Sequence, residues 1–316
     1  MKLIKQPKYI YTFVYHPDEF ELCRMERRSL FGIDTEQNFI ITDRKINPSR
    51  SPFIEDFLEV YVEAHSFEEL KQIINGIKFT DSSYKVVCLN KMDIGNTKKI
   101  HHPERRKIER QIGQAIDGEP DLNQPDVIFG LLYINECWYF GKATKAESIW
   151  RKHLHKPNSY STALSTRVAR AIVNIAIPEP EGIRAIDPCC GIGTVLIEAL
   201  SMNIDIVGRD ISPLVCVGAR ENIAYFGYET TVTKGSIADV TDYYDVAIVD
   251  LPYNIYSHLS PEQEYDIIQH ARRIANRVLF VSIKPIDDLV QKAGFTITDR
   301  SVAKKSTFVR FILLCE

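Results

Sequence analysis

The sequence predicts an α/β protein with a doubly wound, mostly parallel sheet in its carboxy-terminal half and smaller α+β units before it. Three observations support this fold class. Apolar strand segments alternate with helical segments from residue 164 onward. A glycine turn at 187–194 lies between a buried strand and a helix. The first 89 residues instead follow the order βαββαβ, which is typical of a ferredoxin-like unit.

The amino-terminal half is expected to hold two units, at 1–80 and 81–145, followed by an exposed linker at 146–160. Over the first 89 residues the hydrophobic pattern predicts strands at 8–15, 39–43, 57–62 and 84–89, and helices at 18–30 and 67–77. In the second unit, the apolar residues Ile108, Ile112 and Ala115 recur at helical spacing and predict a basic helix at 104–116. A hairpin at 127–134 and 137–141 is expected to turn at residues 135 and 136.

The carboxy-terminal half, 161–316, is expected to be one domain whose final strand is antiparallel to the others. Strands are expected at 183–186, 205–208, 246–249, 277–283, 295–299 and 308–315. Helices are expected at 164–176, 194–202, 213–226, 262–275 and 286–293.

Composition limits the class of protein. The formal net charge of -3 over 316 residues does not indicate nucleic-acid binding, so any RNA contact must come from a local basic surface. The seven cysteines are odd in number and form no CxxC pair, which argues against a disulfide framework or a cysteine-rich zinc site and favours a reducing, cytoplasmic setting. No apolar run approaches the roughly 20 residues of a membrane helix.

The glycine turn and the acid after the next strand predict a nucleoside-bearing cofactor. Gly191 and Gly193 let the backbone approach a ligand at the carboxyl edge of the sheet. Asp210, just past the next strand, is placed to accept hydrogen bonds from two ribose hydroxyls. A cap on the helix that begins near Pro213 is the alternative role for Asp210. A dinucleotide-dependent dehydrogenase is disfavoured because the position of its third glycine is Leu196.

A second turn, Asp250-Leu251-Pro252-Tyr253, follows the apolar strand at 246–249. The lone pair of an exocyclic amine is delocalised into its base, so the amine is a poor nucleophile. Asp250 and the Leu251 carbonyl supply two acceptors for its N–H groups, and Pro252 stiffens the turn. Tyr253 offers a face on which an extracted base can stack. The alternative is a strand-ending turn with an exposed tyrosine.

With both turns in place, residues 160–316 resemble the class I S-adenosylmethionine-dependent methyltransferases, whose domain is Rossmann-like. They are most similar to the amino-methylating group with an (Asp/Asn)-Pro-Pro-(Tyr/Phe) motif. Residues 187–194 match the DPxCGxGT turn of that group, and residues 162–171 resemble the stretch that borders the methionine end of the cofactor. The resemblance implies the following cofactor-binding residues: Thr162, Ala163, Leu164, Asp187, Cys189, Gly191, Gly193, Thr194, Asp210, Ile211, Ser236 and Ile237. It implies that Asp250, Leu251, Pro252 and Tyr253 are catalytic, and no metal is expected because the sulfonium already activates the methyl group.

Two positions depart from this pattern. Leu251 stands where the group has its first proline. Gly235-Ser236 stands where the group often has Gly-Asp, whose acid reads the adenine amino group. Ser236, the backbone of Ile237 or a displaced Asp239 are the three alternatives for that role.

The amino-terminal half adds a second resemblance. Residues 105–116, 121–127 and the hairpin up to Gly141 resemble a THUMP domain, which in its family follows a ferredoxin-like unit and grips the tRNA acceptor end. The whole chain thus resembles tRNA guanine-N2 methyltransferases of the archaeal and eukaryotic type that act on position 10, and tRNA is the implied partner. The basic residues expected to contact RNA phosphates are Lys98, Lys99, Arg105, Arg106, Lys107 and Arg110. A solvated basic helix face is the alternative for this cluster.

Two rival functions remain open at this stage. A DNA or RNA adenine-N6 methyltransferase shares the amino-methylating motif. A catalytically inactive RNA-binding protein that keeps the fold is the other, because Leu251 breaks that motif.

Overall fold

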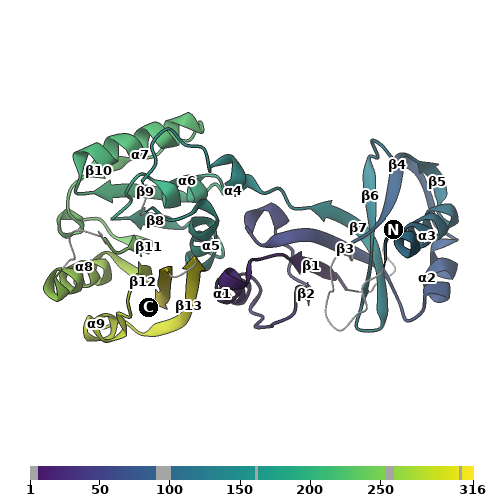
Figure 1. The fold of residues 1–316 in the computed structure, drawn as a ribbon, viewed down its shortest axis with the longest axis horizontal. Helices are drawn as coiled ribbons and strands as arrows, with labels where there is room; N and C mark the ends of the chain where they lie inside the picture. Colours follow the sequence, from purple (N-terminus) through teal and green to yellow (C-terminus); the bar gives the residue numbers. More distant parts are fainter. Residues whose placement is uncertain (1–5, 90–100, 161–162, 253–259, 306–307) are drawn as a thin grey trace. The chain divides into compact units, whose positions relative to one another are not determined.

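The computed structural model describes residues 6–89, 101–160, 163–252, 260–305 and 308–316, and the chain divides into two compact units (Figure 1). The first unit consists of Met1–Val14, Thr35–Ser49 and Phe53–Glu147. The second consists of Tyr15–Asp34, Arg50–Pro52 and Ser148–Glu316. The carboxy-terminal unit therefore incorporates two short segments from the amino-terminal part of the chain.

In the described part of the first unit, seven strands form one sheet in the order β2-β1-β3-β7-β6-β4-β5. The strands are β1 (Tyr9–Phe13), β2 (Phe39–Thr42), β3 (Ile54–Ala64), β4 (Lys78–Cys88), β5 (Asp117–Pro120), β6 (Val127–Ile134) and β7 (Cys137–Lys145). The helices are α2 (Phe67–Ile74), α3 (His102–Ala115) and the 3-10 turn η2 (Pro48–Arg50). Leu70, Ile74, Ile108 and Ile112 of α2 and α3 share a core with Phe129 and Phe140 of the sheet.

The pairing of these strands differs from a ferredoxin-like unit. The expected order βαββαβ is present, but β1 pairs antiparallel with both β2 and β3, and β4 pairs in parallel with β5 and β6. The expected units at 1–80 and 81–145 thus contribute strands to a single sheet. Element order alone does not determine which strands pair, and α1, which would cover this sheet in a ferredoxin-like unit, belongs to the second unit. The expected hairpin between β6 and β7 is confirmed, with Asn135 and Glu136 at φ 49° and 62° in its turn.

In the described part of the second unit, seven strands form a sheet in the order β10-β9-β8-β11-β12-β14-β13. The strands are β8 (Arg184–Asp187), β9 (Asp205–Asp210), β10 (Val232–Lys234), β11 (Tyr244–Asp250), β12 (Ala275–Ser282), β13 (Ile297–Lys305) and β14 (Phe308–Cys315). The five strands β8 to β12 are mutually parallel, and β14 runs antiparallel to both β12 and β13. The expected Rossmann-like sheet with an antiparallel last strand is confirmed. The strand order runs outward in opposite directions from β8 and β11, and sheets of this kind bind ligands at such a switch point.

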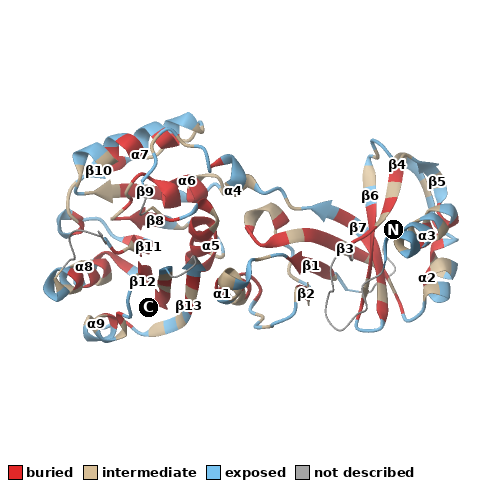
Figure 2. Ribbon diagram, in the orientation of Figure 1, coloured by how far each residue is buried: buried red, intermediate tan, exposed pale blue. Residues whose placement is uncertain are grey.

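Helices cover this sheet, and its central strands are buried (Figure 2). The helices described in the second unit are α1 (Phe20–Phe31), α4 (Ile149–Lys152), α5 (Thr166–Ala176), α6 (Thr194–Leu200), α7 (Pro213–Tyr225), α8 (Pro261–Ile274) and α9 (Asp287–Lys292), with the 3-10 turns η1 (Pro17–Glu19) and η3 (Ile237–Asp239). Strands β11 and β12 read as nearly continuous apolar runs because both faces are covered. Their Ala247, Val249, Val278 and Phe280 lie in the main core of the unit.

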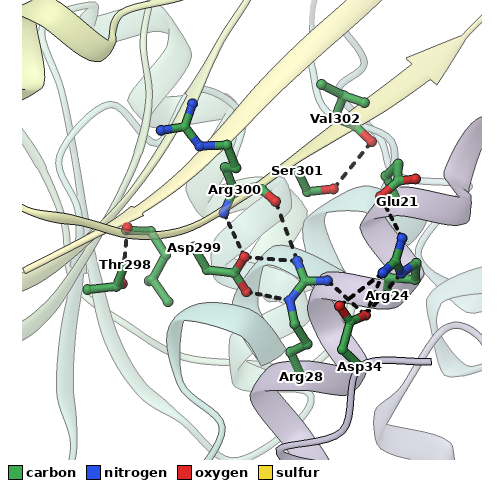
Figure 3. Close-up of polar contacts among 10 residues, drawn as sticks. Glu21, Arg24, Arg28, Asp34, Thr298, Asp299, Arg300, Ser301 and Val302 are labelled. Carbon is green, nitrogen blue, oxygen red and sulfur yellow. Dashed lines mark hydrogen bonds and ion pairs between the residues drawn. The ribbon is translucent and has the colours of Figure 1, made fainter.

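Helix α1 is part of the second unit through a polar network with β13 (Figure 3). Arg28 donates two hydrogen bonds to the Asp299 carboxylate, at 2.9 and 2.8 Å. Arg24 and Arg28 also bind Asp34, which follows the helix. A bidentate arginine–carboxylate pair fixes orientation, so this network holds α1 against the end strand of the sheet.

The exposed linker expected at 146–160 is wrong in part. Residues 149–152 form α4, and His153 is buried, with its Nδ1 2.7 Å from Glu198 Oε1 of α6. Arg170 donates to the other oxygen of Glu198 at 2.8 Å. Most of this stretch is exposed, but its His153, Lys156 and Asn158 bind polar groups of α6 and α7.

Candidate active site

Three carboxylates meet at the carboxyl edge of the second sheet. Asp187 ends β8, Asp210 ends β9 and Asp250 ends β11. Asp187 lies opposite Gly208 of β9, and Asp210 is two residues further along that strand. On β11, which pairs with the other side of β8, Ala247 lies opposite Ile186, so Ile248 lies opposite Asp187. Asp250 is two residues beyond Ile248 along β11. Since side chains alternate along a strand, all three carboxylates point to the same face of the sheet.

The glycine turn leaves room for a ligand and is tied to Asp210. Gly191 and Gly193 have φ angles of 52° and 80°, which favour glycine, and a Cβ built on Gly191 would meet no heavy atom within 4 Å. The Gly191 N–H donates to Asp210 Oδ2 at 3.0 Å, and the Ser212 N–H donates to Oδ1 at 2.9 Å. Ser212, and not Asp210, caps α7 through Val215, so the alternative role of Asp210 as that cap is excluded.

Asp187 is a structural member of the turn. It is buried, and its Oδ1 accepts a hydrogen bond from the Cys189 N–H at 3.1 Å. Burial raises the pKa of Asp187 well above its ordinary value, with smaller contributions from the charges of Asp250 and Asp210. Burial also raises the pKa of the Cys189 thiol. Both effects indicate a desolvated turn whose backbone, more than its side chains, is presented to a ligand.

The third carboxylate, Asp250, has an acceptor oxygen that the described residues leave unsatisfied. Its Oδ1 is buried and accepts no hydrogen bond from the residues that the structure describes. Burial raises its pKa from 3.8 to about 7, and the charge of Arg310 opposes this rise. A buried acceptor oxygen without a partner costs free energy, so its persistence here suits a site that a ligand completes. The exposed Pro252 follows the turn, and the expected base-stacking residue, Tyr253, lies outside the described residues.

Leu251 is held in the turn by packing and by its backbone. Its side chain is 4% exposed and belongs to the main core of the unit. Its N–H donates to the Val281 carbonyl of β12 at 2.9 Å. Proline lacks this donor, so the departure at position 251 replaces ring stiffness with a hydrogen bond and buried apolar contacts.

At the expected adenine end, the polar side chains are engaged in local structure. Ser236 caps η3, and Asp239 binds the Ser236 N–H at 3.0 Å. Ile237 is buried. Gly235 has a φ angle of 156°, which favours glycine, and a Cβ there would also displace the Arg209 guanidinium, whose nearest nitrogen would lie 2.1 Å away. The role of Ser236 and Ile237 in reading the adenine stays a prediction.

Three of the remaining positions expected to bind the cofactor are described. Ile211, beside Asp210, is 70% exposed and offers an apolar surface next to the acid expected to bind the ribose. Ala163 and the buried Leu164 precede α5, which Ser165 caps. Thr162 lies outside the described residues.

Three residues that the sequence analysis did not assign to the site support the glycine turn. The buried Thr194, at the start of α6, accepts a hydrogen bond from Lys156 Nζ at 2.9 Å. Burial lowers the pKa of Lys156. The side-chain amide of Asn222 on α7 donates to the Ile192 carbonyl at 3.0 Å. The same amide accepts from the Asn158 N–H at 2.8 Å and donates to the Asn158 carbonyl at 3.0 Å. The 156–158 segment is thereby fastened over the turn, and no local sequence pattern signals such a long-range amide clamp.

In the first unit, α3 presents basic residues on one side and apolar residues on the other. Arg106, Lys107 and Arg110 are exposed and Arg105 is partly buried. The opposing acid Glu109 accepts a hydrogen bond from the Cys88 N–H at 2.9 Å and lies 3.8 Å from Arg106. Lys98 and Lys99 lie outside the described residues. The described part of α3 therefore has a net positive exposed face.

Two features are absent from the described ranges. No cluster of three or more histidine, cysteine or acidic side chains there could hold a metal ion. None of the helices in those ranges is long and apolar enough to span a membrane.

Residues 154–279 match the model of the UPF0020 family, described as an RMKL-like methyltransferase domain. The matched region contains the glycine turn and the acids at the ends of β8, β9 and β11. The fold, the site and this match define the class of protein: a methyltransferase with a Rossmann-like domain that uses S-adenosylmethionine, as expected from the sequence.

Curated relatives narrow the comparison. The chain is 26% identical over 234 residues to the tRNA (guanine(10)-N2)-dimethyltransferase of Methanothermobacter thermautotrophicus, an alignment covering 69% of this chain and 66% of the relative. It is 25% identical over 277 residues to the tRNA (guanine(10)-N2)-dimethyltransferase of Pyrococcus abyssi, covering 78% and 76%. A tRNA (guanine(6)-N2)-methyltransferase of Archaeoglobus fulgidus is 23% identical over 235 residues, covering 62% of this chain and 59% of the relative.

Among solved structures, the crystal structure of TrmN from Thermus thermophilus is similar in fold over 98% of this chain and 99% of that one. Its TM-score is 0.51 and its sequence identity 16%. This likeness extends through both units of the chain and concerns the fold alone.

Proposed function

We propose that this protein transfers a methyl group from S-adenosylmethionine to the exocyclic N2 amino group of a guanosine in tRNA, with position 10 as the first candidate. The observation that carries the proposal is Asp250, whose buried Oδ1 has no hydrogen-bond donor in the described structure and lies on the same face of the sheet as Asp187 and Asp210. The relatives named above act on guanine N2 of tRNA, at positions 10 and 6.

The residues of the site fit the cofactor. The open space at Gly191 admits a ligand close to the backbone, and Asp210 retains acceptor capacity for the ribose hydroxyls beyond its two backbone bonds. Ile211 supplies an apolar contact beside the ribose. When bound, S-adenosylmethionine supplies an electrophilic methyl group on a sulfonium.

The chain's own residues hold the nucleophile. The Asp250 carboxylate and the Leu251 carbonyl accept the two N–H bonds of the target amine, which orients its lone pair toward the methyl group. A carboxylate accepts more strongly than a carboxylic acid, so the ionised form of Asp250 is the active one. In this mechanism Tyr253 stacks against the base once it has left its helix.

The first unit supplies the contact with tRNA. The exposed basic face of α3, with Arg106, Lys107 and Arg110, suits a phosphate backbone. Arginine and lysine bind phosphates by neutralising their charge, without recognising the base sequence. We place the reaction in the cytoplasm, where the seven free cysteines stay reduced.

Methylation of unmodified tRNA transcripts by the purified chain tests this proposal. After reaction with labelled S-adenosylmethionine, nuclease digestion and mass spectrometry identify the product as N2-methylguanosine, N2-dimethylguanosine or N6-methyladenosine. Transcripts with adenosine in place of guanosine at position 10 or at position 6 identify the target. We expect label in guanosine, and its loss with the position-10 substitution.

Asp250→Ala is expected to lower kcat by about 10²–10³-fold while S-adenosylmethionine and tRNA still bind. Asp242→Asn is the matched control, because Asp242 lies before β11, at the opposite end of that strand, and pairs at the surface with Arg184. Label in N6-methyladenosine would establish the rival adenine reaction. A chain that binds cofactor and tRNA without methylating any transcript would establish an inactive RNA-binding protein.

A further inference from the structure

Helix α4 and the first turn of α5 bring one aromatic ring and two arginines together. The guanidinium of Arg151 lies over the Trp150 ring, 5.3 Å from its centroid, and that of Arg167 lies over the same ring at 5.4 Å. Arg151 is exposed, and Trp150 and Arg167 are partly exposed. These three residues, the Trp150 cluster, have no role in the proposed methyl transfer.

The cluster lies at the level of the carboxyl edge of the second sheet. Helix α5 leads into β8, so it runs toward the amino edge, where its Ile175 carbonyl accepts a hydrogen bond from Arg277 of β12 at 3.3 Å. A helix rises about 1.5 Å per residue, so Arg167 lies roughly 12 Å from Ile175 toward the carboxyl edge. On β12, Val281 lies roughly 13 Å beyond Arg277 at about 3.3 Å per residue, and it pairs with Asp250. Arg167 is therefore level with the end of β11.

The chain around the cluster is basic. Residues 148–160 contain Arg151, Lys152 and Lys156 and no acid, whereas the whole chain has a formal net charge of -3. Glu19 of η1 pairs with Arg167 at 3.3 Å and offsets part of its charge. Arg151 forms no ion pair with any acid in the part of the chain that the structure describes. This segment is thus a local basic surface of the kind that an acidic chain needs for binding RNA.

Stacking on a ring leaves the hydrogen-bonding groups of an arginine available. A guanidinium that lies over an aromatic ring uses its face, while its N–H donors point outward in its own plane. Pairs of these donors match the oxygens of a phosphate group. The ring also restricts the side chain before binding, which lowers the ordering cost of the contact. Trp150 therefore orders Arg151 for phosphate binding, and Arg167 adds positive charge beside it.

We propose that the Trp150 cluster is a phosphate-binding site for the tRNA strand that enters the catalytic edge, in addition to the basic face of α3. A nucleotide that leaves its helix to reach an active site brings its own backbone with it, so phosphates on either side of the target come to this edge. The inference rests on the proposed tRNA methylation for the identity of the RNA, but the contact needs only phosphate and no methyl transfer. Phosphate contacts position RNA without reading bases, so loss of the cluster weakens binding and leaves the choice of guanosine unchanged.

The test is tRNA binding by the full chain over a range of salt concentrations, for Arg151→Gln and Trp150→Leu. Arg151→Gln is expected to weaken binding about ten-fold at low salt, because a charge-assisted contact is lost. It should also flatten the log–log salt slope by about 0.7 to 0.9, the value of one phosphate contact. Trp150→Leu keeps both charges, so its slope stays parental while affinity falls about two- to five-fold. Because Trp150 acts partly through Arg151, the double variant should lose less than the product of the two single losses.

The matched control is a second stacked arginine at the opposite edge. Arg184 lies over the Tyr244 ring at 4.6 Å and begins β8 at the amino edge of the sheet. Arg184→Gln should bind tRNA with the parental affinity and salt slope. Binding of S-adenosylhomocysteine and the Tm are measured for every variant, and the exposed Arg151→Gln should change neither. If Trp150→Leu does not fold, Arg151→Lys replaces it, because lysine keeps the charge without the planar paired donors.

Fluorescence gives a second readout that needs no methyl transfer. The chain has two tryptophans, so Trp138→Phe leaves Trp150 as the sole emitter, and its emission should change when tRNA is added and recover at high salt. A parental salt slope for Arg151→Gln would overturn the inference, as would an equal loss of affinity in Arg184→Gln. A lower Tm with weaker S-adenosylhomocysteine binding in Arg151→Gln would make the cluster purely structural. If the slope and the emission respond as expected although the parent methylates no tRNA, the site stands and the proposed function fails.

Discussion

Replacing Glu26 with glutamine is expected to remove a specific pH dependence from the stability of the second unit. Glu26 lies on α1 and is completely buried. Its carboxyl accepts hydrogen bonds from Ser51 Oγ at 2.5 Å and Asn174 Nδ2 at 2.6 Å. Burial nevertheless raises its pKa from 4.5 to about 7, because these hydrogen bonds and the nearby cations Arg170 and Arg50 only partly offset desolvation.

The sign follows from proton linkage. Below pH 4.5 the carboxyl is protonated in both states, and between 4.5 and about 7 only the folded state keeps its proton. Stability is therefore lost as the pH rises through this window and is constant above it. A gap of about 2.5 pKa units at about 1.4 kcal/mol each amounts to roughly 3 kcal/mol at pH 8. Glutamine keeps the shape, accepts from Asn174 and donates to Ser51, and does not titrate.

Thermal unfolding of the parent and of Glu26→Gln at pH 4.5 to 8.5 measures this effect. The difference in Tm is expected to grow with pH in favour of glutamine, by roughly 6–12 °C, for a unit of this size. The comparison cancels Asp250 and Asp187, whose raised pKa values act in the same direction in both proteins. Glu21→Gln, an exposed change on the same helix, is the control. Parallel Tm profiles for the parent and Glu26→Gln would refute the reasoning.

Three further predictions concern the site and the basic helix. Asp210→Ala is expected to weaken binding of S-adenosylhomocysteine at least ten-fold in calorimetric titration, since charge-assisted hydrogen bonds are worth about 1.5–3 kcal/mol each; an unchanged Kd would remove Asp210 from the cofactor site. Neutralising the four basic residues Lys98, Lys99, Arg105 and Arg106 should weaken tRNA binding while cofactor binding stays intact. The slope of the log–log salt dependence should flatten by about 0.7 to 0.9 per lost phosphate contact, and a parental slope would mean that these residues form only a solvated face. Leu251→Pro loses the bond from the Leu251 N–H to Val281, so its Tm should fall by an amount equivalent to about 0.5–1.5 kcal/mol or more; a higher Tm would show that ring stiffness dominates at this position.

The second unit was predictable because its signals are local. A glycine turn after an apolar strand, and an acid after each of the neighbouring strands, appear in order along the chain, and parallel strands bring their carboxyl ends to one edge. The register then aligns Asp187, Asp210 and Asp250 on one face. The first unit was less predictable because strand order does not reveal pairing. The helix at 20–31 has the sequence of a surface helix, yet Glu26 and Arg27 are completely buried. Partners outside the helix, Ser51 and the far more distant Asn174, donate hydrogen bonds to the buried Glu26 carboxyl, and no local pattern reveals them.

At position 251, where the amino-methylating motif has proline, tertiary contacts fix the backbone conformation instead of a proline ring. In the motif, proline fixes φ at the residue whose carbonyl faces the target amine, and it does so without help from the rest of the protein. At Leu251 the same residue is fixed by a backbone hydrogen bond to Val281 and by a side chain that is 4% exposed within the main core. Val281 is also the residue opposite Asp250 in the β11–β12 ladder. One residue of β12 thus neighbours the backbone of Asp250 and binds the N–H of Leu251, so the tertiary structure fixes this turn where the motif would use proline.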